Sequence, residues 1–260
     1  PFTAAVAGGW RTTTPPLRTE LGLSDASAAA PPGAARGQAI VVGRSSGTGA
    51  TLLPAALVRS LPSAPRGEAV KLGNLQAYRY RRLRPAGAPV TTIVAAPTAS
   101  DGVATVACVG EAVQASCDRV AASLRAKGVE PVALGPHPAY AEAVDRALSR
   151  LAHARAAAPG RIREAKSRRA QGAVARDVSR AYARAGASLR RAPITPAERD
   201  TNAALLTALG RAGAAWRSLG NAAAHGDARG YTTARATIAR REAALRQAMS
   251  ALRALGYEVR

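Results

Sequence analysis

The chain has 260 residues and a formal net charge of +21, which comes from 37 basic and 16 acidic residues. Hydrophobic residues make up 47% of the sequence and aromatic residues only 3%, so the core must be built mainly from alanine, leucine and valine. No run of about 18 apolar residues occurs, which excludes a membrane-spanning helix within this sequence. Because the sequence begins with Pro1 and not with Met, we expect it to be part of a longer protein.

The positive charge is unevenly distributed. Residues 1–135 contain 14 basic and 7 acidic residues, whereas residues 136–260 contain 23 and 9. Most Pro and Gly residues lie in the first part, and we predict two domains with these boundaries. Codon bias in a GC-rich genome can explain the choice of arginine over lysine but not the scarcity of acids. We therefore expect a positive field that attracts polyanions.

The first part has the pattern of strands with a few helices. Short apolar or alternating runs predict the strands, and Asp101-Gly102 predicts a tight hairpin turn between the last two of them. Proline and glycine at suitable positions bound the helices. The predicted strands are 38–43, 75–83, 90–96 and 103–109, and the predicted helices are 54–61 and 116–127.

The two cysteines, Cys108 and Cys117, admit three interpretations: a disulfide, two separate thiols or half of a metal site. No second pair of Cys or His lies nearby, which argues against the metal site. Cys108 would end a strand and Cys117 would open the next helix, so a bridge would hold this helix to the sheet. We predict the disulfide on the condition that the compartment is oxidising.

The second part has the apolar spacing of long amphipathic helices. Pro159-Gly160 predicts the end of a helix over 138–158, and Pro193 the end of a second over 161–191. TPAE at 195–198 is the pattern of a capping box for the third helix, and Asp227 caps the fourth. Arg241 interrupts the near-heptad seam of the fourth. We therefore predict an α+β fold, with a curved antiparallel sheet and covering helices followed by an antiparallel up-and-down helical bundle.

No catalytic or cofactor motif is complete, and we assign no catalytic, cofactor-binding or metal-binding residue. The segment GRSSGTGAT at 43–51 follows a strand, which would suit a phosphate-binding loop. However, Ala50 stands where a phosphate loop needs Lys, and Leu52 stands where a dinucleotide-binding fold needs its third Gly. We interpret this segment as a flexible surface loop. The basic run at 161–169 would ring a single helix rather than line one face, which is typical of a solvated helix start.

One strand combines aromatic and basic residues. Tyr78 and Tyr80 share one face of the strand at 75–83, Arg79 and Arg81 share the other, and Arg82 follows. This set could stack against an anionic ligand and clamp it. The same pattern is also typical of a strand with a core face and a wet face, and both interpretations stand at this point.

Several segments of the first part follow one another in a familiar order: Gly9-Trp10, LGLSDA at 21–26, QAIVVG at 38–43, TLLPAAL at 51–57, GNLQAYRY at 73–80, the hairpin and SCDRVAASLR at 116–125. Together they cover about residues 1–130 and resemble a PsbP-like module, in which helices cover a curved antiparallel sheet. The whole chain, with ALRALGY near its C-terminus, is similar to extracytoplasmic regions of actinobacterial membrane proteins. Some of those follow a serine/threonine kinase domain and one membrane span, so the resemblance implies an ectodomain without kinase activity, and it transfers no site residues.

We therefore expect a non-enzymatic module outside the cytoplasm, secreted or tethered to the membrane by a segment upstream of Pro1. Its partner would be an unknown ligand, an anionic cell-envelope polymer or a protein, with no cofactor and no sequence-specific nucleic acid. The alternative is a cytoplasmic protein that binds nucleic acid through charge, and an enzyme ranks third. The disulfide separates the first two, because cytosolic proteins rarely keep one.

Overall fold

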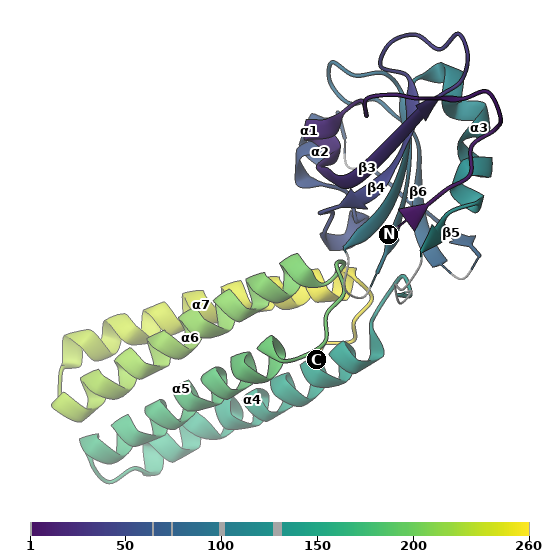
Figure 1. Cartoon of the computed structure of the whole chain (residues 1–260). Coiled ribbons are helices and arrows are strands. Elements are labelled where there is room, and N and C mark those ends of the chain that lie inside the picture. The colour runs from purple at the N-terminus through teal and green to yellow at the C-terminus, as the bar shows by residue number, and fades with distance from the viewer. Residues whose placement is uncertain (1, 64, 74, 99–101, 127–131, 260) are drawn as a thin grey trace. The chain divides into compact units, whose positions relative to one another are not determined.

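The structure is a computed structural model and describes residues 2–63, 65–73, 75–98, 102–126 and 132–259. The chain divides into two compact units, Pro1–Gly135 with Ile194–Arg199, and Pro136–Pro193 with Asp200–Arg260. The first unit holds a sheet with short helices and the second holds four long helices (Figure 1). None of the described helices is long and apolar enough to cross a membrane.

The sheet unit is built on a seven-stranded antiparallel sheet with the order β2-β3-β4-β8-β7-β6-β5. The predicted fold class, an antiparallel sheet with helices followed by a helical bundle, is therefore confirmed. Two further strands, β1 (Phe2–Thr3) and β9 (Arg125–Ala126), pair with each other. The strands of the large sheet are β2 (Arg11–Thr12), β3 (Leu23–Ala30), β4 (Ala39–Ser45), β5 (Glu68–Leu72), β6 (Leu75–Leu83), β7 (Thr91–Pro97) and β8 (Val103–Val109).

Both faces of the sheet are covered. Helix α3 (Glu111–Ala122) lies on one face, and α1 (Arg18–Leu21) and α2 (Ala55–Ser60) lie on the other (Figure 1). Every residue of β7 and β8 is buried, which explains why neither strand alternates between apolar and charged residues. The predicted hairpin is confirmed, with Thr91 opposite Val109. Asp101, the first residue of its predicted turn, lies outside the described residues.

Three strands of the sheet, β2, β3 and β5, were not predicted, and β2 is only two residues long. Strand β3 consists mainly of Ala and Ser, which have little strand preference, and β5 is a charged strand at the edge of the sheet. The segment 43–51, predicted as a surface loop, is instead largely packed. Ser45 is buried at the end of β4, and a side chain at Gly47 would collide with the backbone oxygen of Leu52. Its glycines thus permit close packing of the turn that contains the short helix Gly49–Thr51.

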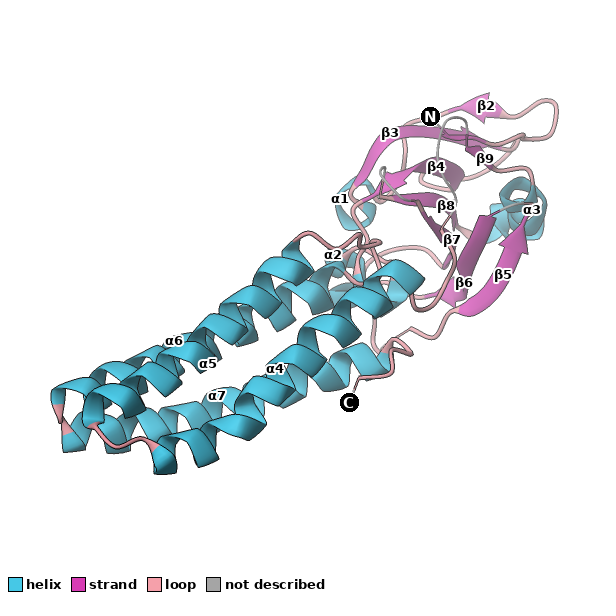
Figure 2. Ribbon diagram, turned by 90° about the horizontal axis from the view of Figure 1, so that it is seen from below, coloured by secondary structure: helices cyan, strands magenta, loops and turns pink. Residues whose placement is uncertain are grey.

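The second unit is an up-and-down bundle in which consecutive helices run antiparallel (Figure 2). The predicted apolar seams face its interior: Val178 of α5, Leu209 of α6 and Leu245 of α7 are all buried. A helix of 27 residues is about 40 Å long, and α4 and α5 contact each other extensively. The helices are α4 (Pro138–Glu164), α5 (Arg168–Arg190), α6 (Arg199–His225) and α7 (Ala228–Ala254).

The predicted helix end at Pro159-Gly160 is wrong, because α4 continues through Pro159 to Glu164. A proline inside a helix removes one backbone hydrogen bond. Packing against the rest of the bundle outweighs this loss, since Ala158 is fully buried and Ile162 is half-buried.

The turn between the two helices lies instead just before Ser167. The side chain of Ser167 accepts a hydrogen bond from the backbone N–H of Ala170 and caps α5. The basic run at 161–169 therefore straddles two helices, and our placement of it on one helix start is wrong. Its cationic residues are exposed, as predicted, and Arg161 forms an ion pair with Asp177.

The caps of the last two helices follow the sequence pattern closely. Glu198 accepts a hydrogen bond from the backbone N–H of Thr195 at 2.6 Å, which is the reach-back half of a capping box. The regular helix begins one residue later, at Arg199. Asp227 accepts a hydrogen bond from the backbone N–H of Gly230 at 2.8 Å and caps α7, as predicted.

Glycines bring α5 and α6 into close contact. An added Cβ at Gly172 would lie 2.5 Å from the backbone oxygen of Gly220, and one at Gly220 would lie 2.9 Å from the backbone oxygen of Gly172. Ser179 donates a hydrogen bond of 2.8 Å to the backbone oxygen of Gly213 in the same interface. Only a residue without a side chain allows two helix backbones to approach this closely.

Candidate functional site

The aromatic residues of the predicted strand site form part of the core. Tyr80 is 1% exposed, and its hydroxyl donates a hydrogen bond of 2.6 Å to the backbone oxygen of Thr51. Burial raises the pKa of Tyr80 far above its ordinary value. Tyr78 is half-buried against the same core, with its ring 6.4 Å from that of Tyr80. The predicted sharing of one face is correct, and that face is covered.

The arginines on the opposite face of β6 are held by acidic residues. Arg79 donates three hydrogen bonds to the carboxylate of Glu68 on β5, two of 3.0 and 2.9 Å from one terminal nitrogen and one of 3.2 Å from Nε. The other terminal nitrogen donates one of 3.0 Å to Asp118 on α3. Arg81 donates a hydrogen bond of 3.3 Å to the other oxygen of Asp118. The hydrogen bond with Glu68 raises the pKa of Arg79 further.

A bulge in β6 brings Arg82 to the same side. The pairing with β7 shifts between Tyr80 and Leu83, and Arg82 has a left-handed backbone with φ of 50°. Its guanidinium then pairs with Glu111 at the start of α3, at 2.8 Å. All three arginines of the predicted site thus contact carboxylates. An anionic ligand would have to displace these acids, and ligand binding by Tyr78 to Arg82 stays a prediction.

The predicted disulfide between Cys108 and Cys117 is present. Both residues are buried, and the bridge joins β8 to α3. The predicted start of this helix is wrong, because α3 begins at Glu111 and Cys117 lies in its middle. Gly110, with φ of 92°, lets the chain turn directly from strand to helix, and the side-chain oxygen of Gln38 accepts a hydrogen bond from an N–H of the first turn.

A carboxylate inside the bundle connects all four helices. One oxygen of Glu242 on α7 accepts hydrogen bonds from Nε of Arg155 on α4 at 3.1 Å, from the hydroxyl of Tyr182 on α5 at 3.1 Å and from Nε1 of Trp216 on α6 at 3.4 Å. The other oxygen pairs with Arg155 at 2.9 Å, and the Glu242 side chain is only 18% exposed. We call these four residues the Glu242 network.

Electrostatics favours this arrangement of donors around one carboxylate. Burial raises the pKa of Tyr182, so that its hydroxyl keeps its proton and remains a donor. Burial lowers the pKa of Arg155, but the hydrogen bond and the charge of Glu242 outweigh this effect and leave the pKa raised. The negative charge of Glu242 is therefore matched within the network.

The residue predicted to interrupt the apolar seam of α7 is wrong. Arg241, expected to interrupt the seam, is exposed, and Glu242 faces the interior in its place. The spacing carries the signal that was missed. Glu242 follows Ile238 by four residues and precedes Leu245 by three, which is the heptad alternation of inward positions.

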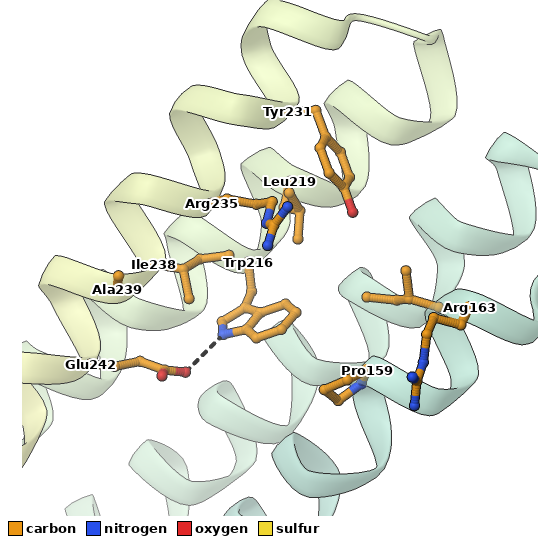
Figure 3. A pocket seen from close by; sticks show the side chains of 10 residues that line it. Pro159, Arg163, Trp216, Leu219, Tyr231, Arg235, Ile238, Ala239 and Glu242 are labelled. Atoms are coloured by element: carbon orange, nitrogen blue, oxygen red, sulfur yellow. Dashed lines mark hydrogen bonds between the residues drawn. The ribbon is translucent and has the colours of Figure 1, made fainter.

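A cleft of about 630 Å³ opens beside the Glu242 network, between α4, α6 and α7 (Figure 3). Trp216 and Leu219 of α6 lie between the two outer helices. Ile238 and the small Ala239 line the cleft from the facing side of α7. The lining consists of Pro159, Ile162, Arg163, Trp216, Leu219, Tyr231, Arg235, Ile238, Ala239 and Glu242.

The cleft combines an apolar interior with positive charge. Arg163 of α4 and Arg235 of α7 are exposed, and neither has a carboxylate partner in the part of the chain that the structure describes. Figure 3 shows Tyr231 and Arg235 extending from α7 toward the space that faces α4. Glu242 is already paired with Arg155. The volume lies in the range of small-molecule sites, and the two guanidiniums suit an anionic group.

No protein-family model, curated protein or solved structure matches this chain. The resemblance to a PsbP-like module and to actinobacterial ectodomains therefore stays a prediction. Among the described residues, no group of three or more His, Cys, Asp and Glu side chains could hold a metal ion. The cleft was not predicted, because Arg163, Trp216 and Arg235 lie on three helices and share no local sequence pattern.

Proposed function

We propose that this chain is a non-enzymatic binding module that works outside the cytoplasm as part of a membrane-anchored protein. The bundle cleft would be its ligand site, and the ligand would be a small organic anion with an apolar body. The observation that carries this proposal is the pair Arg163 and Arg235, two exposed guanidiniums beside Trp216 and Leu219 that have no carboxylate partner among the described residues. The apolar part would pack between the helices, and the acidic group would meet the arginines at the surface.

The disulfide supports the proposed compartment. A bridge between Cys108 and Cys117 is stable in an oxidising environment, and cytosolic proteins rarely keep one. The alternative function, charge-driven binding of nucleic acid in the cytoplasm, is favoured by the net charge of +21. Thiol titration of the protein from its native host, denatured without reduction, separates the two. Two free thiols would favour the alternative.

Calorimetric titration of the oxidised full chain with naphthalene-2-sulfonate tests the cleft. The neutral naphthalene-2-sulfonamide serves as the matched ligand, because it keeps the ring and lacks the charge. We expect the sulfonate to bind at least tenfold more tightly than the sulfonamide. Arg235→Gln should abolish this preference, and Ala239→Leu should weaken both ligands by filling the cleft.

Arg246→Gln is the control for Arg235→Gln, since Arg246 is exposed on the same helix and lies outside the cleft lining. It changes the net charge of the protein by the same amount. Equal effects of the two substitutions would mean that the sulfonate responds to the overall field. The cleft would then lose its role as the ligand site.

A further inference from the structure

A second concave surface lies on the other side of α4, between α4 and α5. Its volume is about 360 Å³. Buried small and apolar side chains, among them Leu151, Ala181 and Ala185, form its floor, and arginines from both helices flank it. We call this surface the α4–α5 groove. Its lining consists of Arg146, Ala147, Arg150, Leu151, Ala154, Ala181, Arg184, Ala185 and Ser188.

The groove is more strongly basic than the cleft. Arg146 and Arg150 are one turn apart on α4, and Arg184 faces them from α5. Arg146 has an exposed partner in Glu142 at 3.5 Å, whereas neither Arg150 nor Arg184 pairs with a carboxylate among the described residues. Three like charges beside one shallow floor repel one another. A multivalent anion in the groove would relieve this repulsion.

We propose that the α4–α5 groove binds the phosphate groups of a linear anionic polymer that carries no bases. Guanidinium groups match phosphate geometry with two parallel hydrogen bonds. Arginines on both sides of an elongated floor can contact successive phosphates of one chain, and the hydroxyl of Ser188 adds a further donor. This site is separate from the cleft, and the inference does not rest on the proposed function.

The lining of the groove argues against nucleic acid as the occupant. Proteins that hold single strands stack the bases on aromatic side chains. The groove lining contains alanines, a leucine, a serine and arginines, and no aromatic residue. It offers contacts to phosphates but no platform for bases.

The test uses the full oxidised chain and sodium tripolyphosphate as the probe, titrated by calorimetry at physiological ionic strength. The double variant Arg150→Ala/Arg184→Ala removes two positive charges from the groove. The control double variant Arg211→Ala/Arg217→Ala removes two exposed arginines from α6, which lie outside the groove and the cleft. Circular dichroism checks that each variant keeps its helices.

We expect the groove variant to weaken tripolyphosphate binding at least tenfold and the α6 variant less than threefold. Ser188→Glu, which adds a carboxylate and keeps every arginine, should also weaken binding at least tenfold. Equal losses in the two double variants would overturn the proposal, because they would assign the affinity to the net charge. Full retention of binding by Ser188→Glu would overturn it as well.

Two further probes distinguish the source of the phosphates. Single-stranded oligothymidylate should bind more weakly than a polyphosphate of the same length and equal charge. Phosphatidylglycerol vesicles should bind the groove variant and the α6 variant equally well. Tighter binding of the oligonucleotide, with a tenfold loss in the groove variant, would assign the groove to nucleic acid. A loss of vesicle binding in the groove variant alone would assign it to a membrane surface.

Discussion

The sheet unit and the bundle carry their arginines in different ways. On β6 of the sheet unit, Arg79, Arg81 and Arg82 all reach carboxylates from β5 and α3. In the bundle, Arg150 and Arg184 flank a groove without carboxylate partners among the described residues. The bundle segment 136–260 also has 23 basic and only 9 acidic residues. The arginines of β6 therefore hold elements of the sheet unit together, whereas Arg150 and Arg184 leave positive charge on the surface of the bundle.

The interiors of the sheet unit and the bundle also differ. The sheet unit has two apolar layers and a covalent bridge at Cys108 and Cys117. The bundle has small residues, close glycine contacts and one internal carboxylate, Glu242. The comparison teaches that paired charges and a covalent bridge hold the sheet unit together, whereas the bundle presents arginines without carboxylate partners among the described residues beside concave surfaces. The protein contains two tryptophans, Trp10 and Trp216, one in each unit, so variants with a single tryptophan can follow each unit separately.

The largest expected effect concerns the Glu242 network. Glu242→Ala leaves three donors inside the bundle without their acceptor, and we expect it to lower the free energy of unfolding by roughly 2–4 kcal/mol. Urea denaturation followed by circular dichroism measures this. Glu142→Ala breaks an exposed pair on α4 and should cost about 0.5 kcal/mol or less. Similar costs for the two variants would remove the network as a stabilising feature.

The disulfide should act on the sheet unit alone. Replacing Cys108 and Cys117 by alanine releases a short closed loop, which costs about 2.7 kcal/mol by the loop-closure model. In a Trp216→Phe background, Trp10 fluorescence should report this loss in denaturant. In a Trp10→Phe background, Trp216 should unfold as before. A shift of the Trp216 transition would show that the units unfold together.

Glycine substitutions should separate close packing from helix propensity within the bundle. Gly172→Ala places a methyl group against the backbone oxygen of Gly220 and should destabilise the bundle by about 1–3 kcal/mol. Gly210→Ala on α6 meets no atom within 4 Å and should stabilise by about 0.5–1 kcal/mol. Urea denaturation followed by Trp216 fluorescence measures both. The prediction fails if the two substitutions change stability in the same direction.

The smallest effect near neutral pH concerns two of the buried tyrosines, Tyr80 in the sheet unit and Tyr182 in the bundle. Folding raises the pKa of Tyr80 and of Tyr182, so the neutral form stabilises the fold. This contribution is complete below the unfolded pKa of about 10 and is lost as the pH rises above it. Both units should therefore unfold in alkali. Tyrosine absorbance and circular dichroism, recorded from pH 8 to 13, should change together, and full ionisation without unfolding would contradict this prediction.

Local patterns in the sequence determined much of the fold. The alternation in β6, the β7–β8 hairpin, the cap at Asp227 and the seam of α7 were all predicted, because period and capping are properties of neighbouring residues. The pair Cys108 and Cys117 could be predicted for a related reason, since a short separation constrains where the two residues can lie.

Contacts between elements were decided by the tertiary structure alone. The path of α4 through Pro159, the carboxylates that hold Arg79, and the inward position of Glu242 depend on which helices and strands pack together. Arg79 and Arg150 are both arginines on regular elements, and no neighbouring residue in the sequence says that one is neutralised and the other is not. The difference arises because β5 and α3 bring acids to Arg79, whereas α5 brings Arg184 to Arg150.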